Sequence, residues 1–315
     1  MTRKKLYIPE EVKADIKKHI SSKYPLALEG FFSASEEEDA LTGDLGGTLR
    51  IKNQRVFVKD SQIETPGEWT WSINYHKFRG RGPGATENKL GADGIFELTL
   101  QIGNRVEKKS LLFQSKISWK DDPNILREAI KLTTWREAAF VLNFTPTEYE
   151  AIDLDTIIKS RGKRPSKINF TPLDQFIGEN FLECIVGDID LRYNATTRKL
   201  FWRTNDGQYV STKFSIPQRI AIQINAPDLD TSNSKYREIK NEDIHNFRMN
   251  TSAEEILSLE NNYSPNELKK ARAAKALIYH SDAHSFGDKL LDELLKVRMQ
   301  EINVAHDFLK SSIKE

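Results

Sequence analysis

The amino-acid sequence predicts a mixed α/β protein that ends in a helical region. Three observations support this fold class. Residues 9–153 read, in order, as helices, strands, a helix and a strand, which is typical of a mixed sheet flanked by helices. Residues 168–225 show short alternating runs, which indicate a β-rich appendage. From Thr251 onward, apolar residues recur at helical spacing to the end of the chain.

The N-terminal part contains two predicted helices. The first follows Pro9, and its apolar residues recur at helical spacing at Val12, Ile16 and Ile20. The second is expected to begin near Ser35, because the hydroxyl of this residue can cap a helix. Glu38 follows Ser35 at the spacing of a capping box.

Strand-like runs come next along the chain. They are LRIK (49–52), VFVK (56–59), WTWSINYHKF (69–78), GADGIFELTL (91–100) and KSLLFQSKISW (109–119). The last two are separated by a turn at Gly103-Asn104, so they predict a hairpin. The following segment predicts a helix and then a buried strand, AAFVLNFT, which ends at a turn containing Pro146.

These patterns divide the chain into three expected domains, 1–155, 156–250 and 251–315. The first is the α/β core, the second a β-rich extension with a polar connector, and the third a helical module. A basic segment with a glycine and a proline, KSRGKRPSK (159–167), is interpreted as the linker after the core.

The composition excludes several classes of protein. Hydrophobic residues make up 38% of the chain and charged residues 30%, and no apolar run approaches the ~20 residues of a membrane span. No secretory signal opens the sequence. Cys184 is the single cysteine, which excludes an intrachain disulfide and a cysteine-built metal site. We therefore expect a cytoplasmic protein without a membrane partner.

Asp93, Gln114 and Lys116 are the most informative residues. The acid opens one strand of the predicted hairpin, and Gln-x-Lys closes the other. A hairpin would bring the three side chains to one end of a small sheet. An acid, an amide oxygen and a lysine at one place suit a hard cation, a water and a phosphate.

Residues from about 35 to 150 resemble the restriction-endonuclease-like superfamily, the PD-(D/E)xK nucleases. The most similar variant is the Gln-x-Lys type of modified-DNA restriction enzymes and some phage-defence effectors. The segments that carry the resemblance are EEEDALTG (36–43), TENKLGADG (86–94), LLFQSK (111–116) and AAFVLNFTP (138–146). The resemblance implies a metal-dependent DNA endonuclease, an effector of prokaryotic anti-phage defence, with Mg²⁺ or Mn²⁺ as cofactor.

The resemblance also implies a role for each site residue. Asp93 would be the central metal-binding carboxylate, and Gln114 a neutral oxygen ligand where the family more often has Glu or Asp. Lys116 would position or activate the attacking water and stabilise charge on the phosphate. Glu38 resembles the extra acidic ligand that an early helix supplies in several subfamilies. Glu87 is a further candidate for the metal or its surroundings.

Other readings of these residues stay open. Asp93 fits a turn between glycines, Lys116 fits a solvent-facing strand edge, and Glu38 fits a solvated helix start. Glu37 competes with Glu38, and Glu97 is an alternative ligand on the strand that follows Asp93. A nuclease fold that binds nucleic acid or a partner without cleavage is therefore a second hypothesis.

With a net charge of only +1, DNA contact must come from local clusters of positive charge. One cluster surrounds the glycine-rich segment before Asp93, with Lys77, Arg79, Arg81 and Lys89. The other contains Arg161, Lys163 and Arg164. An uncontrolled nuclease would harm its own cell, so we also expect a protein partner subunit or a homo-oligomer.

The C-terminal residues 263–315 predict two antiparallel helices joined by a polar loop, the first starting at Ser264 and Pro265. This pattern resembles a J domain, the module that engages an ATP-driven heat-shock chaperone. His280 and Asp282 match the first and last residues of the family's His-Pro-Asp tripeptide, with serine between them. The resemblance gives Lys269, Lys270 and Arg272 the role of a chaperone-binding face. A co-chaperone is thus a third hypothesis, and a helical docking hairpin is the alternative.

Overall fold

The computed structural model describes residues 6–34, 37–59, 66–78, 91–166, 168–194, 199–203, 208–227, 252–259, 263–280 and 289–313. The chain forms two compact units, Lys5–Thr204 with Phe214–Lys235, and Met1–Lys4 with Asn205–Lys213 and Tyr236–Glu315. Within the described part of the chain, no helix is long and apolar enough to cross a membrane.

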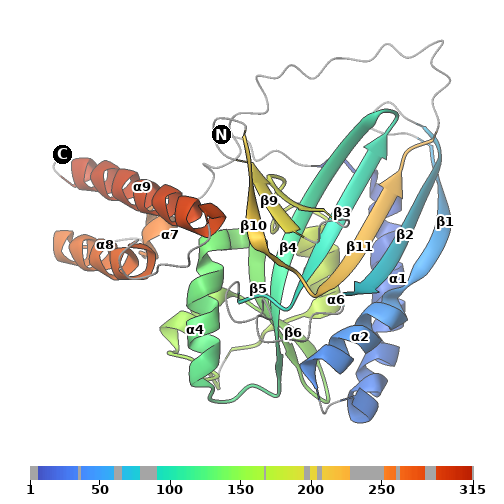
Figure 1. Ribbon diagram of the computed structural model, residues 1–315, viewed down its shortest axis with the longest axis horizontal. Coiled ribbons are helices and arrows are strands. Elements are labelled where there is room, and N and C mark those ends of the chain that lie inside the picture. Colours follow the sequence, from blue (N-terminus) through green and yellow to red (C-terminus); the bar gives the residue numbers. More distant parts are fainter. Residues whose placement is uncertain are drawn as a thin grey trace. The chain divides into compact units, whose positions relative to one another are not determined.

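The larger unit is built on an eight-stranded mixed sheet in the order β1-β2-β11-β3-β4-β5-β6-β7 (Figure 1). Its strands are β1 (Ile51–Val58), β2 (Gly67–Lys77), β3 (Gly94–Ile102), β4 (Arg105–Ile117), β5 (Ala139–Phe144), β6 (Tyr149–Ile152), β7 (Thr171–Pro172) and β11 (Gln218–Asn225). β3 and β4 form the predicted antiparallel hairpin, with its turn at Gly103 and Asn104. β4 runs parallel to β5, and β11 runs parallel to β3. The predicted mixed α/β fold class is confirmed.

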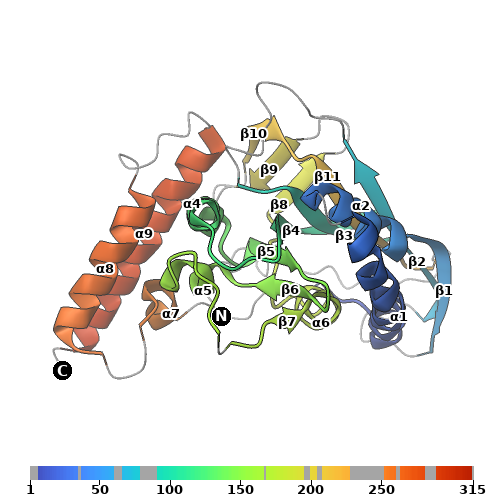
Figure 2. The same ribbon diagram turned by 90° about the horizontal axis from the view of Figure 1, so that it is seen from below.

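The helices of this unit are α1 (Glu10–Ala34), α2 (Glu38–Leu49), α4 (Pro123–Leu132), α5 (Leu154–Lys159) and α6 (Leu173–Gln175). A 3₁₀ helix (Thr133–Ala138) follows α4, and a π-helical turn (Phe176–Phe181) follows α6. α1 and α2 pack together, α2 contacts β2 and β4, and α4 contacts β5 (Figure 2). The apolar stripe predicted for the first helix is buried in the core at Val12, Ile16 and Ile20.

The start of the second helix differs from the prediction. α2 begins at Glu38, its N-cap residue is Glu37, and no side chain caps it. The expected capping box of Ser35 and Glu38 is therefore wrong, because Glu37 is the N-cap residue and Glu38 is the first helical residue rather than the third; Ser35 itself lies outside the described residues. The helix also runs on to Leu49, since Leu41, Leu45 and Leu49 form one buried stripe. The strand expected at 49–52 consequently starts later and merges with the next one into β1.

The segment expected as a β-rich appendage divides between two sheets. β8 (Leu191–Asn194), β9 (Lys199–Arg203) and β10 (Tyr209–Ser215) form a small three-stranded sheet in the order β10-β9-β8. β11 instead lies inside the main sheet, between β2 and β3. The compact units therefore follow different boundaries from the three expected domains.

The C-terminal unit contains α7 (Ala253–Leu257), α8 (Pro265–Tyr279) and α9 (Lys289–Ser312), which confirms the predicted helix pair. Ser264 caps α8, and Glu267 completes a capping box with it. The shared core consists of Leu257, Leu268, Tyr279, Leu295, Ile302, Ala305 and Leu309. Leu277 on α8 is 77% exposed and does not belong to this core.

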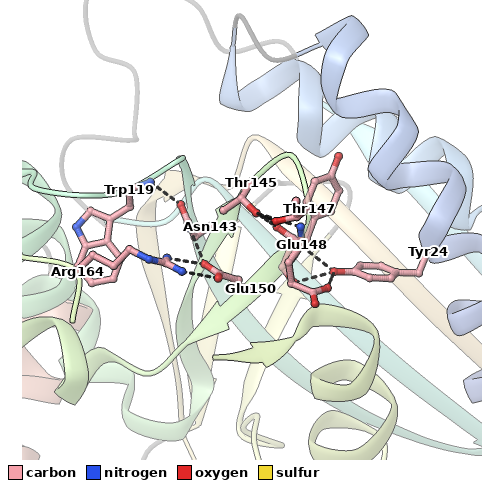
Figure 3. A network of polar contacts seen from close by, with 9 residues as sticks. Tyr24, Trp119, Asn143, Thr145, Thr147, Glu148, Glu150 and Arg164 are labelled. Carbon is pink, nitrogen blue, oxygen red and sulfur yellow. Dashed lines mark hydrogen bonds and ion pairs between the residues drawn. The ribbon is translucent and has the colours of Figure 1, made fainter. Parts of the chain in front are cut away.

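A polar network joins the outer strands of the main sheet to the segment expected as a linker (Figure 3). Both Nη atoms of Arg164 donate to Glu150, each at 2.6 Å. Asn143 donates to Glu150 at 2.7 Å and accepts the backbone N–H of Trp119 at 2.9 Å. The guanidinium also lies 4.7 Å from the ring centre of Phe170. Arg164 therefore fixes residues 159–166 against β5 and β6, and this segment is not a loose linker.

We expect Glu150→Gln to lower the free energy of unfolding by about 2 kcal/mol, because it leaves the Arg164 guanidinium without its carboxylate. Urea denaturation of Glu150→Gln, Arg164→Gln and the double variant measures the coupling between the two side chains. Asp121→Asn, Lys163→Gln and their double variant are the control, because the contact between Asp121 and Lys163 is longer, at 3.9 Å, and both side chains are exposed. A coupling energy no larger than that of the control pair contradicts this prediction.

Candidate active site

Asp93 and Gln114 lie directly opposite each other where β3 begins and β4 nears its end. The backbone N–H of Asp93 donates to the carbonyl of Phe113 at 2.8 Å, and Gly94 pairs with Phe113 in the register. The Oδ2 atom of Asp93 accepts the amide Nε2 of Gln114 at 2.6 Å and the backbone N–H of Ser115 at 2.7 Å. A Cβ atom at Gly94 would lie 2.1 Å from the Phe113 ring, so this close approach requires glycine.

The orientation of the Gln114 amide follows from this contact. A carboxylate oxygen accepts hydrogen bonds, so the amide presents its NH₂ group to Asp93 and turns its carbonyl oxygen away. Both side chains are largely buried, with 9% of Asp93 and 5% of Gln114 exposed. Gln114 can offer its oxygen to a cation beside Asp93 only after its amide group rotates.

Lys116 lies two positions beyond Gln114 on β4, so both side chains share one face of the strand. Its Nζ atom is 2.9 Å from Glu128 Oε2, 3.8 Å from Asp122 Oδ2 and 3.9 Å from Glu38 Oε1. The Lys116 side chain is only 13% exposed. Three carboxylates thus surround one partly buried ammonium group.

Burial raises the pKa of Glu38 to about 7; the positive charge of Lys116 opposes this shift, and Glu128, Asp122 and Asp39 add to it. For Lys116, burial acts to lower the pKa, but contact with Glu128 and the charges of Glu38 and Asp93 outweigh it, and the pKa is raised. Lys116 is therefore an ammonium group at neutral pH. It can neutralise a phosphate or orient a water, but it is poorly suited to act as a base.

The structure brings Asp93, Gln114, Lys116 and Glu38 to one end of the β3–β4 hairpin. Glu87 and the basic residues Arg79, Arg81 and Lys89 lie outside the described residues. Glu97, the alternative ligand, is fully buried and paired with Arg219 and Lys108 instead. It therefore belongs to a separate ion-pair group.

Sequence reasoning missed Asp122 and Glu128. Asp122 is the N-cap residue of α4, and Glu128 lies on the same helix. An acid just before the helix-starting Pro123 was visible in the sequence as a cap signal. Nothing local indicated that this helix faces Lys116, because the contact depends on how the helix crosses from β4 to β5.

The remaining basic residues differ in their surroundings. Lys77 of β2 pairs with Gln218 of β11, and Gln218 in turn pairs with Gly94 of β3. The Nζ atom of Lys77 is 3.1 Å from Asp39 Oδ2. Lys77 thus lies at the same end of the sheet as Asp93. Arg161 and Lys163 are exposed. Arg164 is partly exposed, and its guanidinium is paired with Glu150.

The donor atoms here fit a hard divalent cation in their chemistry. Asp93 and Glu38 supply carboxylate oxygens, and Gln114 supplies an amide oxygen after rotation. Among the residues that the structure describes, no group of three or more His, Cys, Asp or Glu could hold a metal ion. A cation at this place therefore has to use the amide oxygen, the backbone or water besides the carboxylates.

Comparisons of the chain with models of protein families, with curated proteins and with solved structures find no match. The function must therefore be argued from the geometry and charge of this site.

We expect Glu38→Gln to be more stable than the wild type at neutral and alkaline pH. The pKa of Glu38 is about 7 in the folded protein against an ordinary 4.5, so ionising this carboxyl favours the unfolded state. The advantage of the variant is absent below pH 4.5, grows between pH 4.5 and 7, and is constant above pH 7. Thermal denaturation over this range measures it, with the exposed Glu37→Gln as control. A difference that does not change with pH contradicts this prediction.

Proposed function

We propose that the chain is a metal-dependent DNA endonuclease that hydrolyses phosphodiester bonds. The observation that carries this proposal is the meeting of Asp93, Gln114, Lys116 and Glu38 at one end of the β3–β4 hairpin. These residues come from three separate segments of the chain and combine oxygen donors for a cation with a charged lysine. This combination suits the hydrolysis of a phosphodiester. We also propose that the chain acts in the cytoplasm.

Each residue has a distinct task in this proposal. Asp93 and Glu38 would hold Mg²⁺ or Mn²⁺, with the Gln114 amide as a neutral ligand. When bound there, the cation would supply Lewis-acid chemistry for the phosphate and for a water. The Lys116 ammonium group stabilises the negative charge that develops on the phosphate. Because its pKa is raised, it contributes positive charge rather than proton abstraction.

DNA would be held by contacts to its backbone, which do not read sequence. Lys77 supports this role because it lies at the same end of the sheet as Asp93. Arg161 and Lys163 add exposed positive charge. Arg79, Arg81 and Lys89 belong to the segment that leads into Asp93, and we include them in the proposal.

One observation favours a second candidate function, a protein that binds nucleic acid without cleaving it. The Gln114 amide donates to Asp93 and occupies one of its carboxylate oxygens. A site held in this arrangement would bind DNA through positive charge and would not assemble a metal centre. Salt-dependent DNA binding without cleavage in Mg²⁺ or Mn²⁺ supports this alternative.

We also propose that the C-terminal helices dock a partner, either a heat-shock chaperone, a protein subunit or a second copy of the chain. Lys269, Lys270 and Arg272 are exposed on α8, and His280 is the residue that ends it. For the chaperone, we expect the full chain to raise the chaperone's ATPase rate and His280→Gln to abolish the rise. An unchanged ATPase rate contradicts the chaperone as partner and leaves a protein subunit or a second copy of the chain.

We also propose that the protein is an effector of anti-phage defence, and this role rests on the family resemblance.

We expect the full chain to nick or linearise supercoiled plasmid with Mg²⁺ or Mn²⁺ and to lose this activity with a chelator. Asp93→Ala removes a carboxylate ligand, and Lys116→Ala removes the charge that faces the phosphate. Each variant is expected to cleave at least about 100-fold more slowly than the wild type. Rates are read from the loss of supercoiled plasmid on agarose gels.

Lys120→Ala is the matched control for this experiment, because Lys120 is an exposed lysine four positions from Lys116. It is expected to cleave at the wild-type rate. If Asp93→Ala and Lys116→Ala also cleave at that rate, the hydrolytic centre lies elsewhere and the proposed site is wrong.

A further inference from the structure

Glu128 makes the shortest contact of the Lys116 ammonium group. Its Oε2 lies 2.9 Å from Nζ, whereas the oxygens of Asp122 and Glu38 lie at 3.8 Å and 3.9 Å. Its side chain is 21% exposed, so the pair is partly shielded from water. Of these three carboxylates, Glu128 therefore restrains the ammonium group most strongly.

The helix that carries Glu128 is itself firmly fixed. The side chain of Asp122 accepts the N–H of Asn124 at 2.8 Å and caps α4, and Pro123 occupies its first turn. Ile125, Ala129 and Leu132 are fully buried. The backbone beneath Glu128 consequently has little freedom to move relative to the sheet.

The same turn of α4 also contacts the chain that leads into Asp93. Gly91 has φ +69°, and a Cβ there would lie 3.1 Å from the carbonyl oxygen of Glu128 and 3.4 Å from Cβ of Lys131. Gly91 precedes Asp93 by two residues. One turn of α4 therefore packs against Gly91, two residues before Asp93, and also contacts Lys116 through the side chain of Glu128.

We propose that Glu128 is a positioning residue that fixes the Lys116 ammonium group relative to Asp93. This role rests on the proposed nuclease function. Glu128 acts through Lys116 and does not touch DNA or the cation. Without its carboxylate, the ammonium group is left with Asp122 and Glu38 at nearly equal distances. Lys116 would then move toward either carboxylate and leave its place beside the phosphate, and pairing with Glu38 would also withdraw this carboxylate from the cation.

The experiment compares Glu128→Gln, Glu128→Asp and the control Asp121→Asn, an exposed acid close to the same helix. Steady-state cleavage gives kcat, KM for plasmid and the Mg²⁺ concentration for half-maximal rate. We expect Glu128→Gln to lower kcat about 10- to 100-fold, as for other groups that orient an active-site residue. KM for plasmid should stay within about twofold of the wild-type value, because DNA is bound by lysine and arginine side chains other than Lys116. The half-maximal Mg²⁺ concentration should rise, and Glu128→Asp should recover part of kcat.

A second measurement does not depend on nuclease activity. Each protein is treated briefly with an amine-acylating reagent, and mass spectrometry compares acylation of Lys116 with that of the exposed Lys120. Glu128→Gln is expected to raise the relative acylation of Lys116 several-fold, because its ammonium group loses its closest restraint. Asp121→Asn should leave the ratio unchanged.

The outcomes separate the two proposals. If wild-type protein does not cleave DNA but Glu128→Gln raises Lys116 acylation, the nuclease function is wrong and the restraint on Lys116 stands. If Glu128→Gln leaves either kcat or Lys116 acylation unchanged, the positioning role is overturned. If Glu128→Gln does not fold, the same two readouts on Glu128→Asp decide, because a shortened carboxylate must move Lys116 as well.

Discussion

The antiparallel register of β3 and β4 is the constraint on which the rest of the site depends. It sets Asp93 opposite Gln114, so that one carboxylate oxygen receives donors from Gln114 and from the backbone of Ser115. A shift of one residue would turn Gln114 and Lys116 to the other face of the sheet. The ring of Phe113 leaves no room for a side chain at position 94, so the register that pairs Phe113 with this position requires glycine there.

The charge around Lys116 differs from that in the other ion-pair groups of the same unit. Glu97 is paired with Arg219 and Lys108, Glu183 with Lys13 and Lys17, and Glu150 with Arg164. In those groups each carboxylate has at least one cation within contact distance. At Lys116 the ratio is reversed, with three carboxylates around one ammonium group. Crowded negative charge in a partly buried place costs stability, and a bound divalent cation would offset that cost.

Local sequence patterns predicted the features of the fold that are determined by residues close together in the sequence. The stripe of the first helix, the β3–β4 hairpin and the Ser264 cap follow from spacing alone. The position of β11 could not be predicted, because it depends on pairing with β2 and β3, which lie more than a hundred positions away in sequence. The pairing of Arg164 with Glu150 could not be predicted either, because a run of basic residues does not show which of them has a buried acid as partner. The same limit hid Glu128, whose contact with Lys116 is set by the path of α4.

That path is itself a requirement of the fold. β4 and β5 are parallel neighbours, so the chain must cross over between them, and α4 is part of this crossover. The element that makes the parallel pair possible therefore also brings Asp122 and Glu128 to Lys116. Gln114 on β4 is neutral, whereas α2 and α4 supply carboxylates from outside the sheet. Apart from Asp93, the negative charge of the site is thus supplied by α2 and α4 rather than by β4, and its geometry depends on how these helices pack.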